Sequence, residues 1–310
     1  MLAPVVLFVY NRPWHTEQTL IALSENDLAN KSVLYIYADG AKENATDEQL
    51  EKIRQVRNLI KSKQWCKEVH IIESGDNKGL ANSIIDGVTK IVNQYGKIIV
   101  LEDDIVTSRG FLKYMNDALN LYENEEKVMH ISAFVPRNKG LYFLPQTYFL
   151  KFMSCWGWAT WQDAWKYICL NTEYLYSEIT KDKSVLYDYN LDGAIRFEEQ
   201  LETNLSGKIH TWAIKWFTSI YLRGGLCLYP QKSLVRNIGF DGSGVHCGNS
   251  RSDVYDVVLS NKVCVKRIEL KESQRARSYL KKFYFSMNEK RESVSFVKRI
   301  KRRIKKLLKI

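Results

Sequence analysis

Proline and cysteine are scarce in this sequence, and neither falls into a pattern. The 310 residues include 5 Pro, too few for a collagen-like or a proline-rich disordered chain. The six cysteines form no CxxC motif and no short cluster with histidine, which argues against a zinc ribbon or a redox pair. We therefore expect reduced, partly buried thiols in a cytosolic compartment.

Long hydrophobic runs are also missing. No run approaches the ~18 apolar residues that a membrane-spanning helix needs. The apolar segment at residues 2–10 has no basic region before it and continues into Asn11-Arg12-Pro13, so it is typical of a first buried strand rather than of a signal peptide. We expect a protein that is soluble or lies on a membrane without crossing it.

Most of the chain has almost no net charge. The whole sequence carries 46 Lys+Arg against 35 Asp+Glu, a net charge of +11. Residues 281–310 contain twelve of the basic residues and two Glu, which leaves 34 basic and 33 acidic residues in the rest. Binding to a polyanion is therefore expected only of the C-terminal tail.

The first 135 residues alternate short apolar runs with segments of helical period. Apolar runs bounded by polar turns, typical of strands buried on both faces, span residues 5–10, 32–38, 69–73, 97–101 and 128–133. Helical patterns span residues 15–28, 46–61, 80–92 and 111–122. This alternation predicts an α/β fold with a mostly parallel central sheet flanked by helices, in which ligands bind at the carboxyl ends of the strands.

The rest of the chain has a different texture. Between residues 142 and 244 it is rich in aromatic residues and less periodic, with six of the eight Trp between Trp156 and Trp216. We expect residues 136–250 to form an α+β half packed on the sheet, within one domain of residues 1–250. Residues 251–310 are expected to form a charged helical tail.

Three successive carboxylates, Glu102-Asp103-Asp104, follow the apolar run at residues 97–101. Their mutual repulsion makes burial costly unless a cation lies beside them, and Mg²⁺ or Mn²⁺ would remove that cost. Strand alternation would put Glu102 and Asp104 on one side and Asp103 on the other. The alternative without a metal is a solvated acidic turn, or a cap for a helix starting near Ser108.

Other ligand signatures are missing. The sequence has no GxxxxGK[ST], HExxH or GxSxG motif. Gly242-Ser243-Gly244 misses the GxGxxG spacing and opens no helical pattern, so the sequence offers little support for a dinucleotide site.

The acidic triplet and its surroundings resemble glycosyltransferases of the GT-A fold, especially bacterial family-2-like sugar transferases related to the N-acetylglucosaminyltransferase I family. The resemblance covers roughly residues 3–248. It implies a nucleotide-sugar half at residues 1–135 and an acceptor half with a closing loop at residues 136–250. It also implies that Asp104 binds the metal directly, while Glu102 and Asp103 help to hold the ribose and the sugar.

The same resemblance assigns donor contacts along the whole chain, and it implies that Asp39 binds the uracil. By the same resemblance, the loop under the nucleotide contains Asn11 and Arg12, and the nucleotide side of the cleft contains Lys78, Gly79 and Leu80. The sugar pocket contains Trp156, Gly157 and Trp158, and the closing loop contains Ser243 and Gly244. Trp156 and Trp158 are equally suited to a platform under a sugar ring and to packing, whereas packing is expected of Trp161 and Trp165.

Two further roles stay open. His246, in the expected closing loop, is either a metal or phosphate ligand or an ordinary hydrogen-bonding loop residue. Relatives with an assigned general base have an Asp after a Trp at the start of a helix, whereas this chain reads Trp212-Ala213. The base is therefore expected elsewhere, and the carboxylates to test are, in order, Asp241, Asp163 and Glu199.

The tail has the pattern of an amphipathic helix from about residue 294. Apolar residues recur at a spacing of three or four, at Val297, Ile300, Ile304 and Leu307, and Lys or Arg fills most positions between them. An anionic membrane surface attracts such a helix, at ~1 kcal/mol per basic residue. No nucleic acid partner is expected, because no recognised binding fold surrounds the tail, and a plain solvated tail is the remaining alternative.

Together these features predict a metal-dependent, inverting glycosyltransferase. It would move a hexosyl or N-acetylhexosaminyl group from a nucleotide-diphosphate donor, a UDP-sugar, to a hydroxyl of a surface glycan or lipid-linked oligosaccharide in polysaccharide biosynthesis. We expect it in the cytoplasm, peripheral on the inner face of the membrane. The alternatives are a nucleotidyltransferase, which would ordinarily carry a Gly-rich basic loop after the first strand, and a non-catalytic membrane-associated glycan-binding module.

Overall fold

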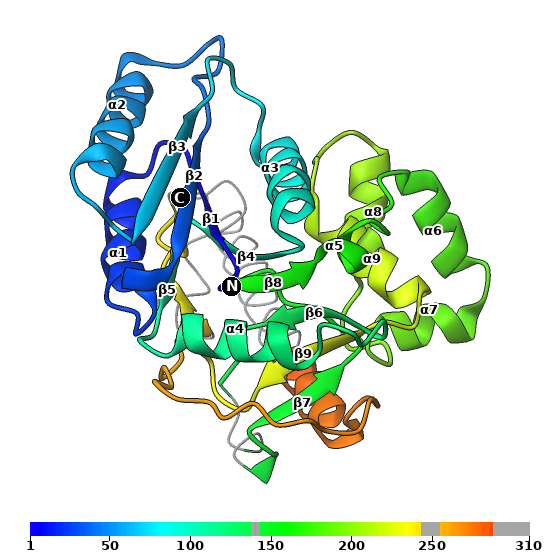
Figure 1. The fold of residues 1–310 in the computed structure, drawn as a ribbon. Coiled ribbons are helices and arrows are strands. Elements are labelled where there is room, and N and C mark those ends of the chain that lie inside the picture. Colours follow the sequence, from blue (N-terminus) through cyan, green and yellow to red (C-terminus); the bar gives the residue numbers. More distant parts are fainter. Residues whose placement is uncertain (138–139, 141–142, 243–254, 288–310) are drawn as a thin grey trace, which may run out of the picture.

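A computed structural model describes residues 1–137, 140, 143–242 and 255–287. Its main feature is a mixed sheet of eight strands in the order β3-β2-β1-β4-β8-β6-β9-β7 (Figure 1). The eight strands are β1 (Val5–Val9), β2 (Val33–Ala38), β3 (Glu68–Glu73), β4 (Lys97–Glu102), β6 (Val128–Ser132), β7 (Thr147–Leu150), β8 (Trp158–Trp161) and β9 (Leu226–Pro230). Two further strands, β5 (Ile105–Thr107) and β10 (Val235–Asn237), form a separate antiparallel pair. The predicted α/β class is confirmed.

Strands β1 to β4 run parallel to one another, as the alternation of apolar runs and helical patterns predicts. The expected burial on both faces holds for β1 and for most of β4, but it is wrong for β3, an edge strand whose residues are all half-buried or exposed. β1 lies between β2 and β4, and every one of its residues is buried. Parallel neighbours need crossover connections, which here contain α1 (Pro13–Ser24), α2 (Asp47–Lys61) and α3 (Leu80–Tyr95). The carboxyl ends of these four strands therefore meet at one edge of the sheet.

Helices cover both faces of the sheet (Figure 1). On one face α1, α2 and α4 (Phe111–Leu121) share a hydrophobic cluster with Val5, Leu7 and Val9 of β1. On the other face α3 shares a cluster with Val6 and Phe8. The second cluster continues into a layer of short helices: α5 (Gln162–Trp165), α6 (Thr172–Thr180), α7 (Lys183–Tyr189), α8 (Glu198–Leu205) and α9 (Ala213–Leu222). A 3-10 turn, η1 (Ala29–Lys31), follows α1.

The two expected halves share this one sheet. β8, from the second half, lies between β4 and β6 and runs antiparallel to both. β9 then pairs with β6 and β7. Residues after 135 therefore complete the sheet that the first half begins, and the sheet has no break at that residue.

The C-terminal part differs from the expected helical tail. Residues 256–273 contain no helix, and Val257 and Val263 are buried against the core. Apolar residues alternate along this segment, so its period is that of an extended chain, which outweighs its charged composition. Tyr122, the residue after α4, donates its hydroxyl to Lys266 O at 3.1 Å. A helix at residues 274–287 then packs beside β7 (Figure 1).

Among the described residues, no helix combines the length and the hydrophobicity needed to cross a membrane. The amphipathic pattern from residue 294 lies outside the described residues.

Candidate functional site

The carboxyl ends of the parallel strands bring the predicted donor residues together. Asn11 and Arg12 follow β1, Asp39 follows β2, and Glu102 ends β4. Pro13 is the first residue of α1, where its missing N–H costs nothing, so the helix begins directly after Arg12. These residues, which are far apart in the sequence, therefore lie along one polar edge of the sheet.

Arg12 contacts both aspartates of the acidic triplet. Its Nη1 atom is 2.8 Å from Asp104 Oδ2 and 3.3 Å from Asp103 Oδ1. The expectation that these two carboxylates point to opposite sides is wrong, because β4 ends at Glu102 and residues 103–104 form a turn. The triplet does not cap a helix either, since β5 separates it from α4.

Burial and mutual repulsion disfavour the charged forms of the triplet. Burial, followed by the charges of Asp104 and Asp103, raises the pKa of Glu102 to about 8. Burial and the charge of Asp104 raise the pKa of Asp103 to about 7. Arg12 opposes both shifts, but one guanidinium faces three carboxylates. The surplus of negative charge would be relieved by a further cation.

Two nitrogen atoms of Arg12 have no hydrogen-bond partner within the described part of the chain. Both Nε and Nη2 are buried. Because buried N–H groups are nearly always paired in proteins, an acceptor atom is expected beside each of these donors. Arg12 is therefore able to donate to an anion while its Nη1 stays with the aspartates.

Residues 238–241, called the cover segment below, lie directly on these groups. Ile238 N donates to Asp104 O at 2.9 Å. Gly239 has no room for a side chain, since an added Cβ would collide with Asp104 Oδ2 and lie 2.8 Å from Arg12 Nη2. The glycine is needed here for close approach of the backbone.

His15 is a site residue that the sequence patterns did not single out. It is buried in the first turn of α1, with Nε2 3.1 Å from Asp241 Oδ2 of the cover segment. Burial and the charge of Arg12 lower the pKa of His15. Its place three residues after Arg12 puts the two side chains on the same side of the helix start, and this spacing is the signal available in the sequence.

Asp39 holds the turn that precedes α3. Its Oδ1 accepts from the backbone N–H groups of Gly40 and Lys78, both at 2.9 Å. Its Oδ2 accepts from Gly79 N at 3.0 Å and from Asn77 Nδ2 at 3.1 Å. Four donors occupy the acceptor positions of one carboxylate, so Asp39 fixes this turn. Contact between Asp39 and a uracil is a proposal.

The other predicted residues of this turn are at the surface. Gly79 is the N-cap of α3 and has a φ of 74°, which a residue with a Cβ rarely adopts. Lys78 Nζ lies 3.2 Å from Asp86 Oδ2, an exposed pair. Leu80, the first residue of α3, is exposed, so a ligand could reach it.

The two tryptophans that flank Gly157 have different environments. Trp158 is completely buried in β8 and stacks on Trp212, with 5.0 Å between ring centroids. The assignment of Trp158 to the donor is therefore wrong, because an inner strand of the sheet holds its ring in the core. Half-buried Trp156 packs edge to face on Phe240 of the cover segment, with 5.5 Å between centroids. Two more tryptophans are buried, as expected: Trp161 and Trp165.

Asp163 lies at the wrong end of the sheet to act as a base. It belongs to α5, which follows β8, and β8 runs antiparallel to β4. Gln162 N donates to Gly96 O, just before β4 begins, whereas the acidic triplet follows the other end of β4. The prediction for Asp163 is wrong because the direction of β8 was not readable from its sequence.

The other two candidate bases differ in their neighbours. Glu199, in α8, pairs with Arg196, and no hydrogen bond or ion pair of the described residues links it to the acidic triplet. Asp241 contacts His15, which lies one helical turn from Arg12, and the side chain of Asp241 is 47% exposed. Of the three, Asp241 is the carboxylate placed beside the site.

The remaining predictions concern residues that the structure does not describe. Ser243, Gly244 and His246 lie outside the described residues. Within the described ranges, no three His, Cys, Asp or Glu side chains are close enough to hold a metal by themselves. The described residues that could share a cation are Asp103 and Asp104, whose oxygen atoms already meet at Arg12 Nη1.

No protein-family model matches the sequence, and no curated protein matches it. Among solved structures, the chain is similar to S. aureus TarS, with 13% identity over 78% of this chain and a TM-score of 0.42. It spans 37% of that TarS chain and 60% of a TarS 1–349 structure. Mouse xyloside xylosyltransferase 1 is 11% identical over 72% of this chain and 82% of its own, with a TM-score of 0.39. A UDP-glucose pyrophosphorylase complexed with UDP-glucose is 12% identical over 75% of this chain and 91% of its own, with a TM-score of 0.37.

Proposed function

We propose that the protein is a glycosyltransferase that takes a sugar from a nucleotide-diphosphate donor, with UDP as the nucleotide. The observation that carries this proposal is the state of Arg12. A buried guanidinium with two unpaired N–H groups lies beside two aspartates, at the carboxyl ends of parallel strands. A diphosphate fits these donors, because the guanidinium fork matches phosphate oxygens in paired hydrogen bonds.

The acidic residues fit a divalent cation. Oxygen atoms of Asp103 and Asp104 converge on one positively charged nitrogen of Arg12. Mg²⁺ and Mn²⁺ are commonly held by one or two carboxylates together with substrate phosphate oxygens, so Asp104, supported by Asp103, would hold the ion. A bound ion supplies positive charge that stabilises the departing diphosphate. His246 is a proposed further ligand.

The chain's own groups would orient the donor and keep water out. Arg12 donates to the diphosphate, and the turn held by Asp39 forms the nucleotide side of the site. Trp156 offers an apolar surface next to the cover segment. Water near the sugar would hydrolyse the donor, so a segment lying on the acidic residues protects it.

Transfer with inversion needs a base that takes the proton of the acceptor hydroxyl as the new bond forms. We assign this role to Asp241, because it is both accessible and close to the acidic residues. His15 Nε2 lies 3.1 Å from Oδ2 of that carboxylate and would orient it. Asp241→Asn should therefore keep UDP binding and lose transfer, and retained transfer would disprove the assignment.

Titration calorimetry with UDP, with and without Mn²⁺, tests the donor site. The wild-type protein should bind UDP more tightly when Mn²⁺ is present. Asp104→Ala should lose this metal effect and all turnover while it keeps the fold. Asp86→Ala, which changes an exposed acid on α3, is the matched control and should behave as wild type. Turnover by Asp104→Ala would refute the metal assignment.

A screen of nucleotide donors narrows the reaction. Release of UDP from a UDP-sugar supports sugar transfer, and the sugar that reacts separates hexosyl from N-acetylhexosaminyl transfer. Release of pyrophosphate from UTP and a sugar phosphate would instead indicate a nucleotidyltransferase. A glycan-binding module would respond to neither UDP nor Mn²⁺.

We also propose that the basic tail brings the enzyme to the anionic inner surface of a membrane, where a lipid-linked acceptor for polysaccharide biosynthesis would be found. The support is the sequence of the tail, in which apolar residues recur every three or four positions and Lys or Arg fills most positions between them. Sedimentation with anionic and with neutral vesicles should show binding of the full chain to the anionic ones. Equal binding by a chain that lacks residues 288–310 would defeat the proposal.

A further inference from the structure

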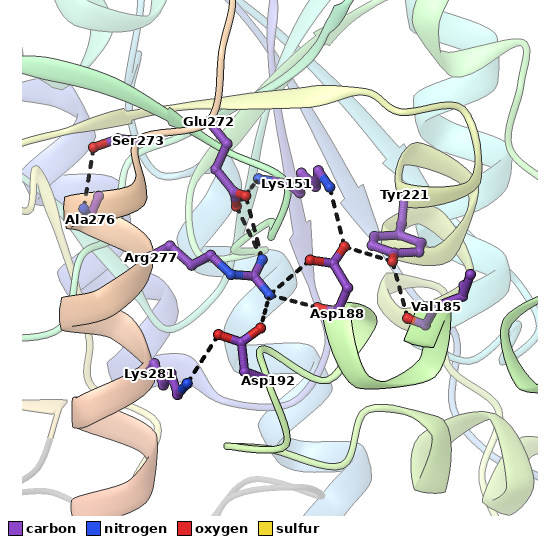
Figure 2. Close-up of polar contacts among 10 residues, drawn as sticks. All are labelled: Lys151, Val185, Asp188, Asp192, Tyr221, Glu272, Ser273, Ala276, Arg277 and Lys281. Atoms are coloured by element: carbon purple, nitrogen blue, oxygen red, sulfur yellow. Dashed lines mark hydrogen bonds and ion pairs between the residues drawn. The ribbon is translucent and has the colours of Figure 1, made fainter. Parts of the chain in front are cut away.

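The helix at residues 274–287 is fixed to the helical layer by one buried arginine (Figure 2). Arg277 Nη2 lies 2.7 Å from Asp192 Oδ1 and 3.0 Å from Asp188 Oδ1. Its Nη1 lies 3.4 Å from Glu272 Oε1. Because movement of the helix would separate these charges in a buried place, the contacts hold it strongly in position.

Neighbouring groups tighten the same cluster (Figure 2). Lys151, the residue after β7, donates its backbone N–H to Glu272 Oε1 at 3.2 Å. Tyr221 of α9 donates its hydroxyl to Asp188 Oδ2 at 2.8 Å. Asp192 has a φ of 55°, a left-handed conformation that aspartate adopts more readily than most residues with a side chain. The helix is thus joined to β7, α7 and α9 at once.

Another part of the helix contacts aromatic rings that lead to the cover segment. Phe283 is buried, and its ring centroid is 6.1 Å from that of Tyr255. Tyr255 stacks on Phe240 with 5.0 Å between centroids and an angle of 18°. Trp156 meets Tyr255 edge to face at 5.1 Å and supports both rings. Three segments far apart in the sequence therefore form one packed row.

Phe240 lies in the middle of the cover segment. The residue before it, Gly239, is packed on Asp104 and Arg12, and the residue after it, Asp241, reaches α1. Closely packed groups transmit small displacements, so the position of the Phe240 ring fixes the position of both neighbours.

We propose that the helix at residues 274–287 positions the cover segment over the acidic residues, through Phe283, Tyr255 and Phe240. The helix at residues 274–287 then contributes to donor binding through the cover segment. This consequence rests on the function proposed above. Phe283 and Tyr255 are positioning residues, because they act through Phe240 and touch no reacting group.

Hydrogen exchange of the unliganded full chain tests the positioning. The N–H groups of Ile238 and Gly239 are hydrogen-bonded, so they exchange slowly while the segment is in place. Phe283→Ala removes the ring that contacts Tyr255 and should speed exchange at these amides about tenfold. Phe285→Ala, an exposed ring on the same helix, is the matched control and should change nothing. Equal exchange in Phe283→Ala and wild type would overturn the proposal.

Variants of Tyr255 test the same proposal if Phe283→Ala does not fold. Tyr255→Phe keeps the stacked ring and should exchange as wild type does, whereas Tyr255→Ala should exchange faster. Slow exchange in Tyr255→Ala would overturn the proposal.

A titration with UDP in the presence of Mn²⁺ measures how these substitutions change the affinity of the donor site for UDP. The Kd for UDP should rise about tenfold in Tyr255→Ala and stay unchanged in Tyr255→Phe and Phe285→Ala. Equal Kd values in all of them would overturn the link between the helix and the donor site. If the wild-type protein binds no UDP while exchange differs as expected, the proposed function fails and the positioning of the cover segment stands.

Discussion

Gly239 passes so close to the acidic residues that its lack of a side chain is a requirement. Gly239→Ala should push the cover segment off the site at a strain of about 1–3 kcal/mol, because the new Cβ would meet Asp104 and Arg12. Binding of UDP with Mn²⁺ should weaken about tenfold or more, as measured by calorimetry. Gly75→Ala is the matched control, since nothing lies within 4 Å of its added Cβ. Equal binding by both variants would contradict the role of Gly239.

His130 is a buried residue of β6 whose two ring nitrogens are both engaged. Nε2 lies 3.1 Å from Ser154 O, and Trp216 Nε1 donates to Nδ1 at 3.3 Å. This arrangement suits the neutral ring, which donates through one nitrogen and accepts through the other. Burial lowers the pKa of His130 to about 3.

Acid should therefore destabilise the protein through His130. The unfolded chain takes up a proton below pH 6.5 and the folded chain only near pH 3, so the unfolded state binds more protons between these values. Stability should fall as pH falls through that window, by about 1.4 kcal/mol per unit. Urea unfolding at about pH 7 and about pH 5 should show a smaller loss for His130→Gln than for wild type, while exposed His210→Gln follows wild type. An unchanged loss in His130→Gln would count against this account.

Individual site residues could be predicted where a strand end places them. Asp103 and Asp104 follow an apolar run, and the end of a parallel strand is where ligands bind. Trp156 and Trp158 look equivalent in the sequence because both flank Gly157. Only the pairing of β8 with β4 and β6 buries Trp158, and that pairing joins distant segments, so local sequence does not reveal it.

Among the elements, those with a clear period were predicted well. The helix expected at residues 111–122 is α4 (Phe111–Leu121), and the strand expected at 97–101 is β4 (Lys97–Glu102). β7 and β8 have four residues each, which is too short for a periodic signal. Their directions depend on partners far along the chain, and for this reason Asp163 was wrongly included among the candidate bases.

The turn after β2 and the turn between β3 and α3 are held together by one carboxylate. Asp39 accepts hydrogen bonds from four donors in the turns that follow β2 and β3. Asp39→Ala should reduce the free energy of unfolding by about 2 kcal/mol, because these donors lose a charged acceptor. Urea unfolding measures the loss, with exposed Asp86→Ala as the control. A loss no larger than that of Asp86→Ala would show that water replaces the carboxylate.

A different substitution of Asp39 tests contact with the base of the nucleotide. If Asp39 contacts uracil, Asp39→Asn should lose any preference for UDP over CDP, in addition to its structural effect. If Asp39 serves the turn alone, binding of both nucleotides should weaken to the same extent.

For the whole molecule, Arg277 holds the last described helix on the core. Arg277→Met should cost about 3–5 kcal/mol of stability, because Asp188, Asp192 and Glu272 would lose their buried partner. Lys281→Met is the matched control on the same helix, since Lys281 is partly exposed and has one ion pair. It should cost less than about 1 kcal/mol. Similar losses for both variants in urea unfolding would contradict a central role for Arg277.

The place of β8 in the sheet affects how the chain can be made. During synthesis, residues 97–102 leave the ribosome well before residues 158–161, so one edge of β4 has no partner for that time. Unpaired strand edges join readily to other chains. A shorter gene product that stops before β8 would keep this edge open permanently. Expression of residues 1–135 by themselves should therefore yield aggregates, and studies of the site around Arg12 need the chain through the last described helix.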